Sequence, residues 1–203
     1  MIKPVEMELA SKAYNEDDDI DTAIEFYEIA AKKGHVLAMV QLIHIYIEKW
    51  ENVSSDSEQR QLYEEKVDYW HQKIRALALQ NDRDAQFELS IFYFWGTLGF
   101  EDHKAAYDWL LKSACNGNPE AQHELSTQHY FSFFGVEPSK TKFRYWLLRA
   151  YKNRNKDATY QIACEYYFKL KKYEKGLSLL KKLSSSGHLE AEETLEAIQQ
   201  GKL

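Results

Sequence analysis

The segment HELSTQH, which begins at His123, carries the residue types of a zinc-protease helix. Such a helix needs the pattern H-E-x-x-H, which brings both histidines to one metal ion from consecutive turns. Here the second histidine is His129, six residues after the first, and six residues turn a helix by about 240°. The two imidazoles therefore point to nearly opposite sides, and the sequence predicts no zinc site at this segment.

Other groups that could do chemistry lack the surroundings that the chemistry requires. The serines at 184–186 stand in no nucleophile elbow, and GTLG from Gly96 lacks the Lys-Ser/Thr that completes a phosphate-binding loop. The acidic run lacks the central glycine and final glutamate of an EF-hand; it comprises Asp17, Asp18, Asp19 and Asp21. We therefore expect no cofactor, no bound metal and no enzymatic activity.

Composition is typical of a folded chain that stays in the cytoplasm. The 203 residues are 44% apolar and 29% charged, and no run approaches the roughly 20 apolar residues that span a bilayer. Glu6 and Glu8 stand where a signal peptide would have its apolar core. Cys115 and Cys164 fit no CxxC or zinc-ligand spacing, so we interpret both as small buried residues in a reduced compartment.

The net charge of −6 conceals an uneven distribution. Residues 1–139 carry 12 Lys/Arg against 25 Asp/Glu, whereas residues 140–182 carry 13 against 3. The chain therefore has a strongly acidic part followed by a strongly basic segment.

Small and large residues recur at fixed offsets along the chain. After Ala121, Leu125 follows at +4 and His129 at +8, which places all three within about 80° on one helix face. The same offsets recur as Ala38, Leu42 and Tyr46, as Ala85, Leu89 and Tyr93, as Ala158, Ile162 and Tyr166, and in part as Ala191 and Leu195. Each set predicts one helix stripe that a neighbouring copy buries.

A helix-ending signal precedes each of these alanines. Gly34, Gly117 and Gly187 lie four residues before the next alanine, and Asn81 holds the equivalent place before Ala85. Glycine and asparagine can take the left-handed conformation that ends a helix. The repeating unit is therefore helix, loop, helix, tight turn.

Large apolar residues and two polar loops complete the unit. A large side chain stands twelve residues before four of the alanines, at Phe26, Trp109, Trp146 and Leu179, and Trp70 precedes Ala85 by fifteen. The stretch ENVSSDSEQR at 51–60 predicts an inserted mobile loop. The stretch NEDDDID from Asn15 predicts a shorter loop whose Asp19 or Asp21 caps the following helix.

The repeated pattern resembles the Sel1-like repeat, a relative of the tetratricopeptide repeat. It consists of A-x-x-x-L-x-x-x-Y, a Gly-bearing loop, and K-A-x-x-W-x-x-K-A-A-x-x-G. GTLGFEDHKAAYDWLLKSACNG from Gly96 is the clearest copy, and FGVEPSKTKFRYWLLRA from Phe134 follows it. The glycine that usually follows the leucine is replaced by Ile43, Ser90, Ser126 and Ala163. The resemblance implies α-helical adaptors that hold other proteins on a concave surface, most of them not enzymes. Some bacterial members look like immunity proteins.

We therefore expect an all-α fold, a right-handed superhelical solenoid of about five antiparallel helix pairs. The expected repeats of this single array span residues 5–35, 36–81, 82–118, 119–155 and 156–188, with a capping helix at 189–200.

The face opposite the packed stripe is also apolar. Positions +2, +6 and +9 lie roughly 165° from that stripe, where a solvated helix is polar. From these positions we predict partner-binding residues, namely Val40, His44, Ile47, Phe87, Ile91, Phe94, His123, Tyr130, Tyr160 and Tyr167. The acidic Asp82, Asp84 and Glu88 would steer the partner's approach. The alternative is that a tightly curled array buries the aromatic face against itself.

Two classes of function fit these patterns. The first is a non-enzymatic protein binder, most concretely a bacterial immunity-type protein that neutralises a basic, nuclease-like toxin, or else a general adaptor. The second is a nucleic-acid binder that uses KTKFRYWLLRAYKNRNK from Lys140, where basic and aromatic residues interleave. The acidic repeats would repel a long polyanion, which favours a protein partner. The sequence leaves open the oligomeric state and the role of segment 140–182, either a solvated helix face or a contact in a head-to-tail dimer.

Overall fold

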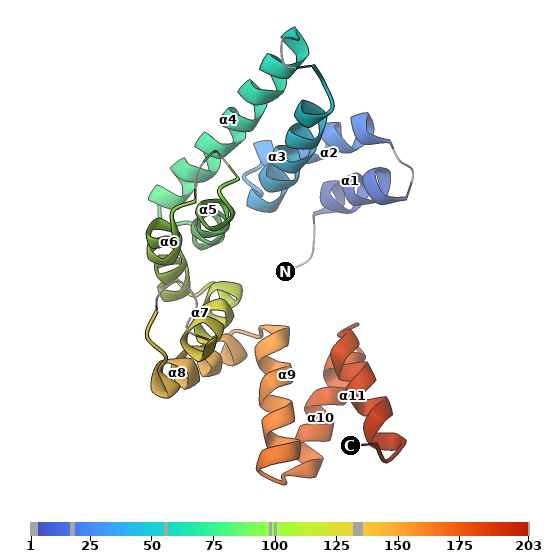
Figure 1. The fold of residues 1–203 in the computed structure, drawn as a ribbon. Coiled ribbons are helices and arrows are strands. Elements are labelled where there is room, and N and C mark those ends of the chain that lie inside the picture. Colours follow the sequence, from blue (N-terminus) through green and yellow to red (C-terminus); the bar gives the residue numbers. More distant parts are fainter. Residues whose placement is uncertain are drawn as a thin grey trace. The chain divides into compact units, whose positions relative to one another are not determined.

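The computed structural model describes residues 4–16, 19–54, 57–97, 99, 101–131 and 136–202, and every regular element in these ranges is helical (Figure 1). The first helices are α1 (Val5–Asn15), α2 (Ile20–Lys32), α3 (Val36–Glu51), α4 (Glu58–Leu79), α5 (Arg83–Trp95) and α6 (His103–Cys115). They are followed by α7 (Pro119–Phe131), α8 (Lys140–Lys152), α9 (Lys156–Cys164), the π-helical η2 (Glu165–Lys169), α10 (Tyr173–Ser184) and α11 (Leu189–Gln199). The prediction of an all-α solenoid is confirmed.

The chain divides into two compact units, Met1–Phe92 and Tyr93–Leu203. In the first unit α1 packs on α2, α2 on α3 and α3 on α4. In the second unit each helix from α6 to α11 likewise packs on the next along the chain. One helix pair falls within each predicted repeat range, and the repeat boundaries themselves stay a prediction.

The predicted stripe forms the core of both units. The alanines at 38, 85, 121, 158 and 191 are fully buried, and so are Leu42 and Leu125. Tyr46 and His129 at the +8 position are also buried, whereas Tyr93 and Tyr166 are partly exposed. An alanine at the start of the stripe lets the preceding helix approach closely, since no larger side chain stands between the two backbones.

The turns before these alanines share one geometry. Gly34, Asn81, Gly117 and Gly187 have positive φ angles of 90°, 67°, 91° and 78°, as predicted. The fifth turn uses Arg154, with a φ of 66°, which the sequence did not predict. In each turn the next amide bonds back five residues, for example Asn118 N to Ser113 O at 3.1 Å. This pairing satisfies a carbonyl at the end of the preceding helix.

In four of these five turns the side chain after the left-handed position caps the next helix, whereas His35 makes no such bond. Side-chain oxygens of Asp82, Asn118 and Asn155 accept hydrogen bonds from the amides three residues ahead at 2.8, 2.7 and 2.8 Å. Asp82 thus caps α5, a role that the sequence analysis did not assign to it, and its part in steering a partner stays a prediction. Asp19 caps α2 as predicted, through Thr22 N at 3.1 Å, while Asp17 and Asp18 lie outside the described residues.

Two expectations about the helix-pair interiors need correction. The predicted loop at 51–60 is shorter, because α4 begins at Glu58 and its first turn contains Arg60. The guanidinium of Arg60 lies 4.2 Å from the Trp50 ring centre and its Nη1 bonds Val53 O at 3.5 Å, which stabilises this helix start. Residues 55–56 of the loop lie outside the described residues. Trp109, expected in the stack, is only partly buried, with Lys112 Nζ 4.1 Å above its ring.

Candidate protein-binding groove

The thirteen residues predicted to contact a partner are divided between the two units. Val40, His44, Ile47, Phe87, Ile91, Asp82, Asp84 and Glu88 belong to the first, and Phe94, His123, Tyr130, Tyr160 and Tyr167 belong to the second. Val40 is only 4% exposed, so its prediction as a contact residue is wrong. It packs in the core because α3 is covered on both sides, by α2 and by α4.

Some of the predicted aromatic residues meet in one groove of the second unit. The groove has a volume of about 360 Å³ and is formed by α7, α8, α9 and η2. Its lining includes Tyr130 and Tyr160 from the predicted set, together with Thr127, Phe131, Phe143, Arg144, Leu147, Gln161, Cys164, Glu165, Phe168 and Lys169. The first helices of two successive repeats therefore contribute Tyr130 and Tyr160 to one concave site.

An aromatic cluster marks one end of this groove. Tyr130 and Phe131 close α7 and are 62% and 60% exposed, which is unusual for neighbouring large rings. The Tyr130 ring lies 4.7 Å from the Phe131 ring in an edge arrangement and 5.2 Å from that of Phe143 in α8. These three rings form an apolar surface that is partly open to solvent.

The rim of the groove is basic. Arg144 pairs with Glu165, the only acidic residue among the described residues of the lining. Lys169 is exposed and has no ion-pair partner among the residues that the structure describes. Lys140 does not itself line the groove, but it lies three and four residues before Phe143 and Arg144 and therefore on the same face of α8, next to the lining.

A π-helical segment shapes another part of the groove. Between Glu165 and Lys169 the chain leaves α-helical geometry, and this turn supplies three lining residues, Glu165, Phe168 and Lys169. Gly176 of α10 packs directly on η2: a Cβ there would lie 2.8 Å from Tyr167 Cβ and 3.0 Å from Ala163 O. Close packing of α10 thus holds η2 from the side away from the groove lining.

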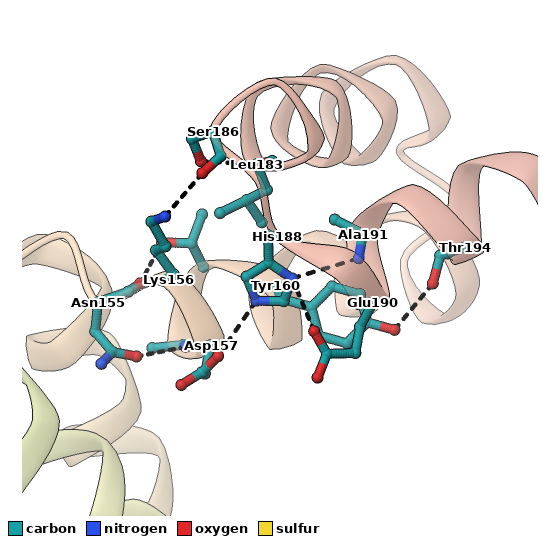
Figure 2. A network of polar contacts seen from close by, with 12 residues as sticks. Asn155, Lys156, Asp157, Tyr160, Leu183, Ser186, His188, Glu190, Ala191 and Thr194 are labelled. Carbon is teal, nitrogen blue, oxygen red and sulfur yellow. Dashed lines mark hydrogen bonds and ion pairs between the residues drawn. The ribbon is translucent and has the colours of Figure 1, made fainter. Parts of the chain in front are cut away.

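Tyr160 is fixed by a polar network that joins α9 to α11 (Figure 2). Its hydroxyl shares a hydrogen bond with Thr194 Oγ1 at 2.9 Å, and its ring stacks on His188 with centres 5.2 Å apart. The buried His188 accepts from Ala191 N through Nδ1 at 3.4 Å and faces Asp157 Oδ1 from Nε2 at 3.2 Å. Tyr160 is therefore a fixed wall of the groove, since both its ring and its hydroxyl have internal partners.

The remaining predicted residues of the second unit lie elsewhere. Tyr167 does not line the groove, because its ring packs edge-on against Tyr173 at 5.1 Å. Phe94 contacts the rings of Trp95 and His103. His123 is partly buried, and burial lowers its pKa, so this imidazole stays neutral near pH 7.

The groove offers recognition rather than acid, base or nucleophilic chemistry. Burial raises the pKa of the Cys164 thiol, which disfavours the reactive thiolate form. Burial also lowers the pKa of His129, whose Nδ1 faces Glu137 O at 3.4 Å. Within the described ranges, no cluster of three or more His, Cys, Asp or Glu side chains could hold a metal ion.

Of the twelve described lining residues, the sequence predicted only Tyr130 and Tyr160 as contact residues. Phe131, Phe143, Leu147 and Phe168 are lining residues that the stripe of each first helix does not contain. Phe143 and Leu147 lie in the segment from Lys140 where basic and aromatic residues interleave, a pattern that the sequence analysis associates with nucleic acid. Phe131 and Phe168 lie outside that segment. Projection of one helix cannot identify residues that a second helix and a π-turn contribute.

The Sel1 repeat family model matches residues 8–35, 83–118 and 119–155. The chain is a Sel1 repeat protein. Two of the three matched segments coincide with the helix pairs α5–α6 and α7–α8, and the second of these pairs carries the aromatic end of the groove. Sel1 repeats generally mediate protein–protein interactions, and proteins built from them are generally non-enzymatic scaffolds.

Solved structures support this fold assignment. The Sel1 repeat protein from Oxalobacter formigenes superposes with a TM-score of 0.61 at 20% identity, over 95% of this chain and 76% of that one. The protective antigen c5321 of uropathogenic Escherichia coli strains, which displays an SLR fold, superposes with a TM-score of 0.54 at 20% identity. That match covers 97% of this Sel1 repeat chain but only 49% of c5321. No curated protein matches the sequence.

None of the helices within the described ranges combines the length and apolar character needed to cross a bilayer.

Proposed function

We propose that this Sel1 repeat protein is a non-enzymatic interaction module that binds a protein partner in the groove of its second unit. The observation that carries the proposal is the exposed pair Tyr130 and Phe131 beside Phe143, at the mouth of a concave, apolar site. Large rings contribute much of the binding energy at protein interfaces because they bury a large area at low entropic cost.

Site-specific photo-crosslinking tests this proposal. A benzoylphenylalanine placed at Phe131 in the full chain should form a discrete adduct in cells of the natural host, because the partner covers this ring. The same probe at Tyr145, which is exposed on α8 but outside the groove lining, is the matched control. Equal labelling at both positions, or no adduct at Phe131, would contradict binding in the groove.

The partner's affinity should also depend on the rings. With the crosslinked protein identified, Tyr130→Ala or Phe131→Ala should weaken its binding by about 2 kcal/mol, mainly through faster dissociation. Tyr145→Ala should leave the affinity unchanged. Surface plasmon resonance measures both rates directly.

The finer proposal is a cytoplasmic immunity-type role, in which the partner is a basic toxin. It is supported by the acidity of the first unit, whose 92 residues carry 10 Lys/Arg against 19 Asp/Glu. A field of this sign accelerates encounter with a basic partner. Expression of the chain should then protect cells from the product of a toxin-like reading frame beside its gene. If that product still kills cells that express the chain, the immunity-type role is contradicted and the general adaptor role is favoured.

Nucleic-acid binding is the competing function, since α8 carries Lys140, Lys142 and Arg144. Tight and steeply salt-dependent binding of a labelled DNA or RNA duplex, lost when these three residues become alanine, would favour it. We expect weak binding at physiological salt, because one of the three cations, Arg144, is already paired with Glu165.

A further inference from the structure

We propose that the occupant of the groove is an acidic, amphipathic segment of the partner, with apolar residues that contact the rings and carboxylates that face the rim. This inference rests on the proposed function and specifies the chemistry of the segment that enters the site. It concerns the local charge of that segment, so it holds for a partner of either overall charge.

The floor of the groove determines the apolar half of the occupant. Phe131 and Tyr130 are more than half exposed, and the floor beneath them includes Leu147, which is buried. Polar side chains in contact with these surfaces would lose water without gaining hydrogen bonds. At about 360 Å³ the groove has room for a few large side chains, not for a folded domain.

The charges along the rim determine the sign of charge that the polar side of the occupant should carry. Three cations, Lys140, Arg144 and Lys169, stand along α8 and at the end of η2. The described lining residues include one carboxylate, Glu165, and Arg144 already neutralises it. Within the described part of the chain Lys140 and Lys169 form no ion pair, so both ammonium groups are available to a carboxylate of the occupant.

The electrostatic field of the segment around the groove is positive, like that of the rim. Residues 140–182, which contain α8, α9, η2 and most of α10, carry 13 Lys/Arg against 3 Asp/Glu. A basic segment that enters the groove would meet this field and would leave Lys140 and Lys169 without partners. An acidic segment gains both attraction on approach and two charge-assisted contacts on arrival.

Selection from an unbiased library tests the inference. A phage library of random 15-residue peptides is panned on the immobilised full chain, and on the Tyr130→Ala/Phe131→Ala variant as the matched control. Peptides enriched on the wild type but not on the control should carry a net negative charge and at least two aromatic or aliphatic residues. Enrichment of neutral or basic peptides, or equal enrichment on both proteins, would overturn the proposal.

Charge reversal sharpens the test. For an enriched peptide made synthetically, fluorescence anisotropy should show at least tenfold weaker binding to the Lys140→Glu/Lys169→Glu variant. The difference should shrink as salt rises, because the contacts are partly exposed. Lys181→Glu/Lys182→Glu in α10 makes the same charge change on exposed residues outside the groove lining and should weaken binding less than twofold. Equal losses in the two double variants would contradict recognition by the rim.

Two further results separate this inference from the proposed function. Adduct formation at Phe131 without any acidic preference among peptides would overturn the acidic segment while protein binding in the groove stands. A concentration-dependent dimer in light scattering that Phe131→Ala abolishes would make a second copy the occupant, which would also overturn it. Absence of both adducts and enriched peptides would contradict both proposals.

Discussion

Arg154 occupies a backbone position that the other four turns of this kind give to glycine or asparagine. Its φ of 66° is left-handed, a conformation that costs most side chains about 1–2 kcal/mol relative to glycine. The turn forms nonetheless, because Asn155 N bonds Ala150 O at 3.0 Å and the Asn155 side chain caps α9. The local structure is thus determined by the contacts around the turn, against the preference of Arg154 itself.

Arg154→Gly should therefore stabilise the protein. The relief of backbone strain exceeds the added freedom of the unfolded chain, and we expect a gain of about 0.5–1 kcal/mol. Urea unfolding followed by circular dichroism measures it. Gly34→Ala is the reverse change in an equivalent turn, where an added Cβ would meet nothing within 4 Å, and it should cost about 1 kcal/mol. A destabilised Arg154→Gly protein would contradict the strain at this turn.

Glu88 makes the stability of the fold depend on pH near neutrality. Burial, and then the nearby charge of Asp84, raise the pKa of the Glu88 carboxyl to about 7. In the unfolded chain this carboxyl ionises from about pH 4.5, whereas in the folded chain it stays protonated up to about pH 7. The free energy of unfolding should therefore fall as the pH rises from about 4.5 to 7.

Glu88→Gln should remove this pH dependence. The variant should match the wild type at pH 4 and exceed its stability by about 3 kcal/mol at pH 8, where the wild type holds a desolvated carboxylate. Urea titrations at several pH values test this, with Glu64→Gln in the exposed face of α4 as the control. Parallel pH profiles for wild type and Glu88→Gln would show that Glu88 titrates normally.

At the scale of helices, the contact between α10 and η2 sets the shape of one end of the groove. Gly176→Ala would place a Cβ within 3.0 Å of Ala163 O and Tyr167 N, backbone atoms that cannot move independently. We expect α10 to shift away and unfolding to become easier by about 1–3 kcal/mol. Leu177→Ala, on the same helix, is a control that loses contacts without a clash.

The effect of Gly176→Ala should extend to the groove. Because η2 supplies Phe168 and Lys169, peptide affinity should fall in this variant beyond what Leu177→Ala produces at similar stability. Anisotropy with an enriched peptide separates the two variants. Unchanged affinity together with unchanged stability would show that α10 tolerates the added methyl group.

The helices were predictable from the sequence, and the groove only in part. The offsets from Ala121 to His129 report burial within one helix, so a repeated pattern identifies each packed face and the turn before it. Tyr130 was predicted from the opposite face of the same helix, at position +9 from Ala121. Phe143 and Phe168 were not, because their place in the groove depends on how α8 packs on α7 and on a π-turn after α9. The prediction of Val40 as a contact residue was wrong for the same reason, since a second neighbouring helix covers it.

At the scale of the whole molecule, contacts in a repeat array reach only the neighbouring helices, so damage should stay local. Trp146 is buried in the second unit, and Trp146→Ala should cost about 3–5 kcal/mol there. Hydrogen exchange measured by mass spectrometry should rise in α7, α8 and α9 and remain at the wild-type level in α1, α2 and α3. Trp109→Ala should have a smaller effect because Trp109 is partly exposed. A uniform rise in exchange along the chain would indicate a single cooperative unit.

The identical capping geometry at Asn118 and Asn155 has an evolutionary consequence. Each asparagine bonds back to a residue five places earlier and caps the helix that begins after it. Recombination that removed or duplicated residues 119–155 would therefore join one asparagine turn to an equivalent helix start, with no new turn sequence required. The exposed rings at 130 and 131 and most of the basic rim lie inside that interval. A single crossover between gene copies could thus transfer, delete or multiply much of the recognition surface while the remaining helices keep their caps.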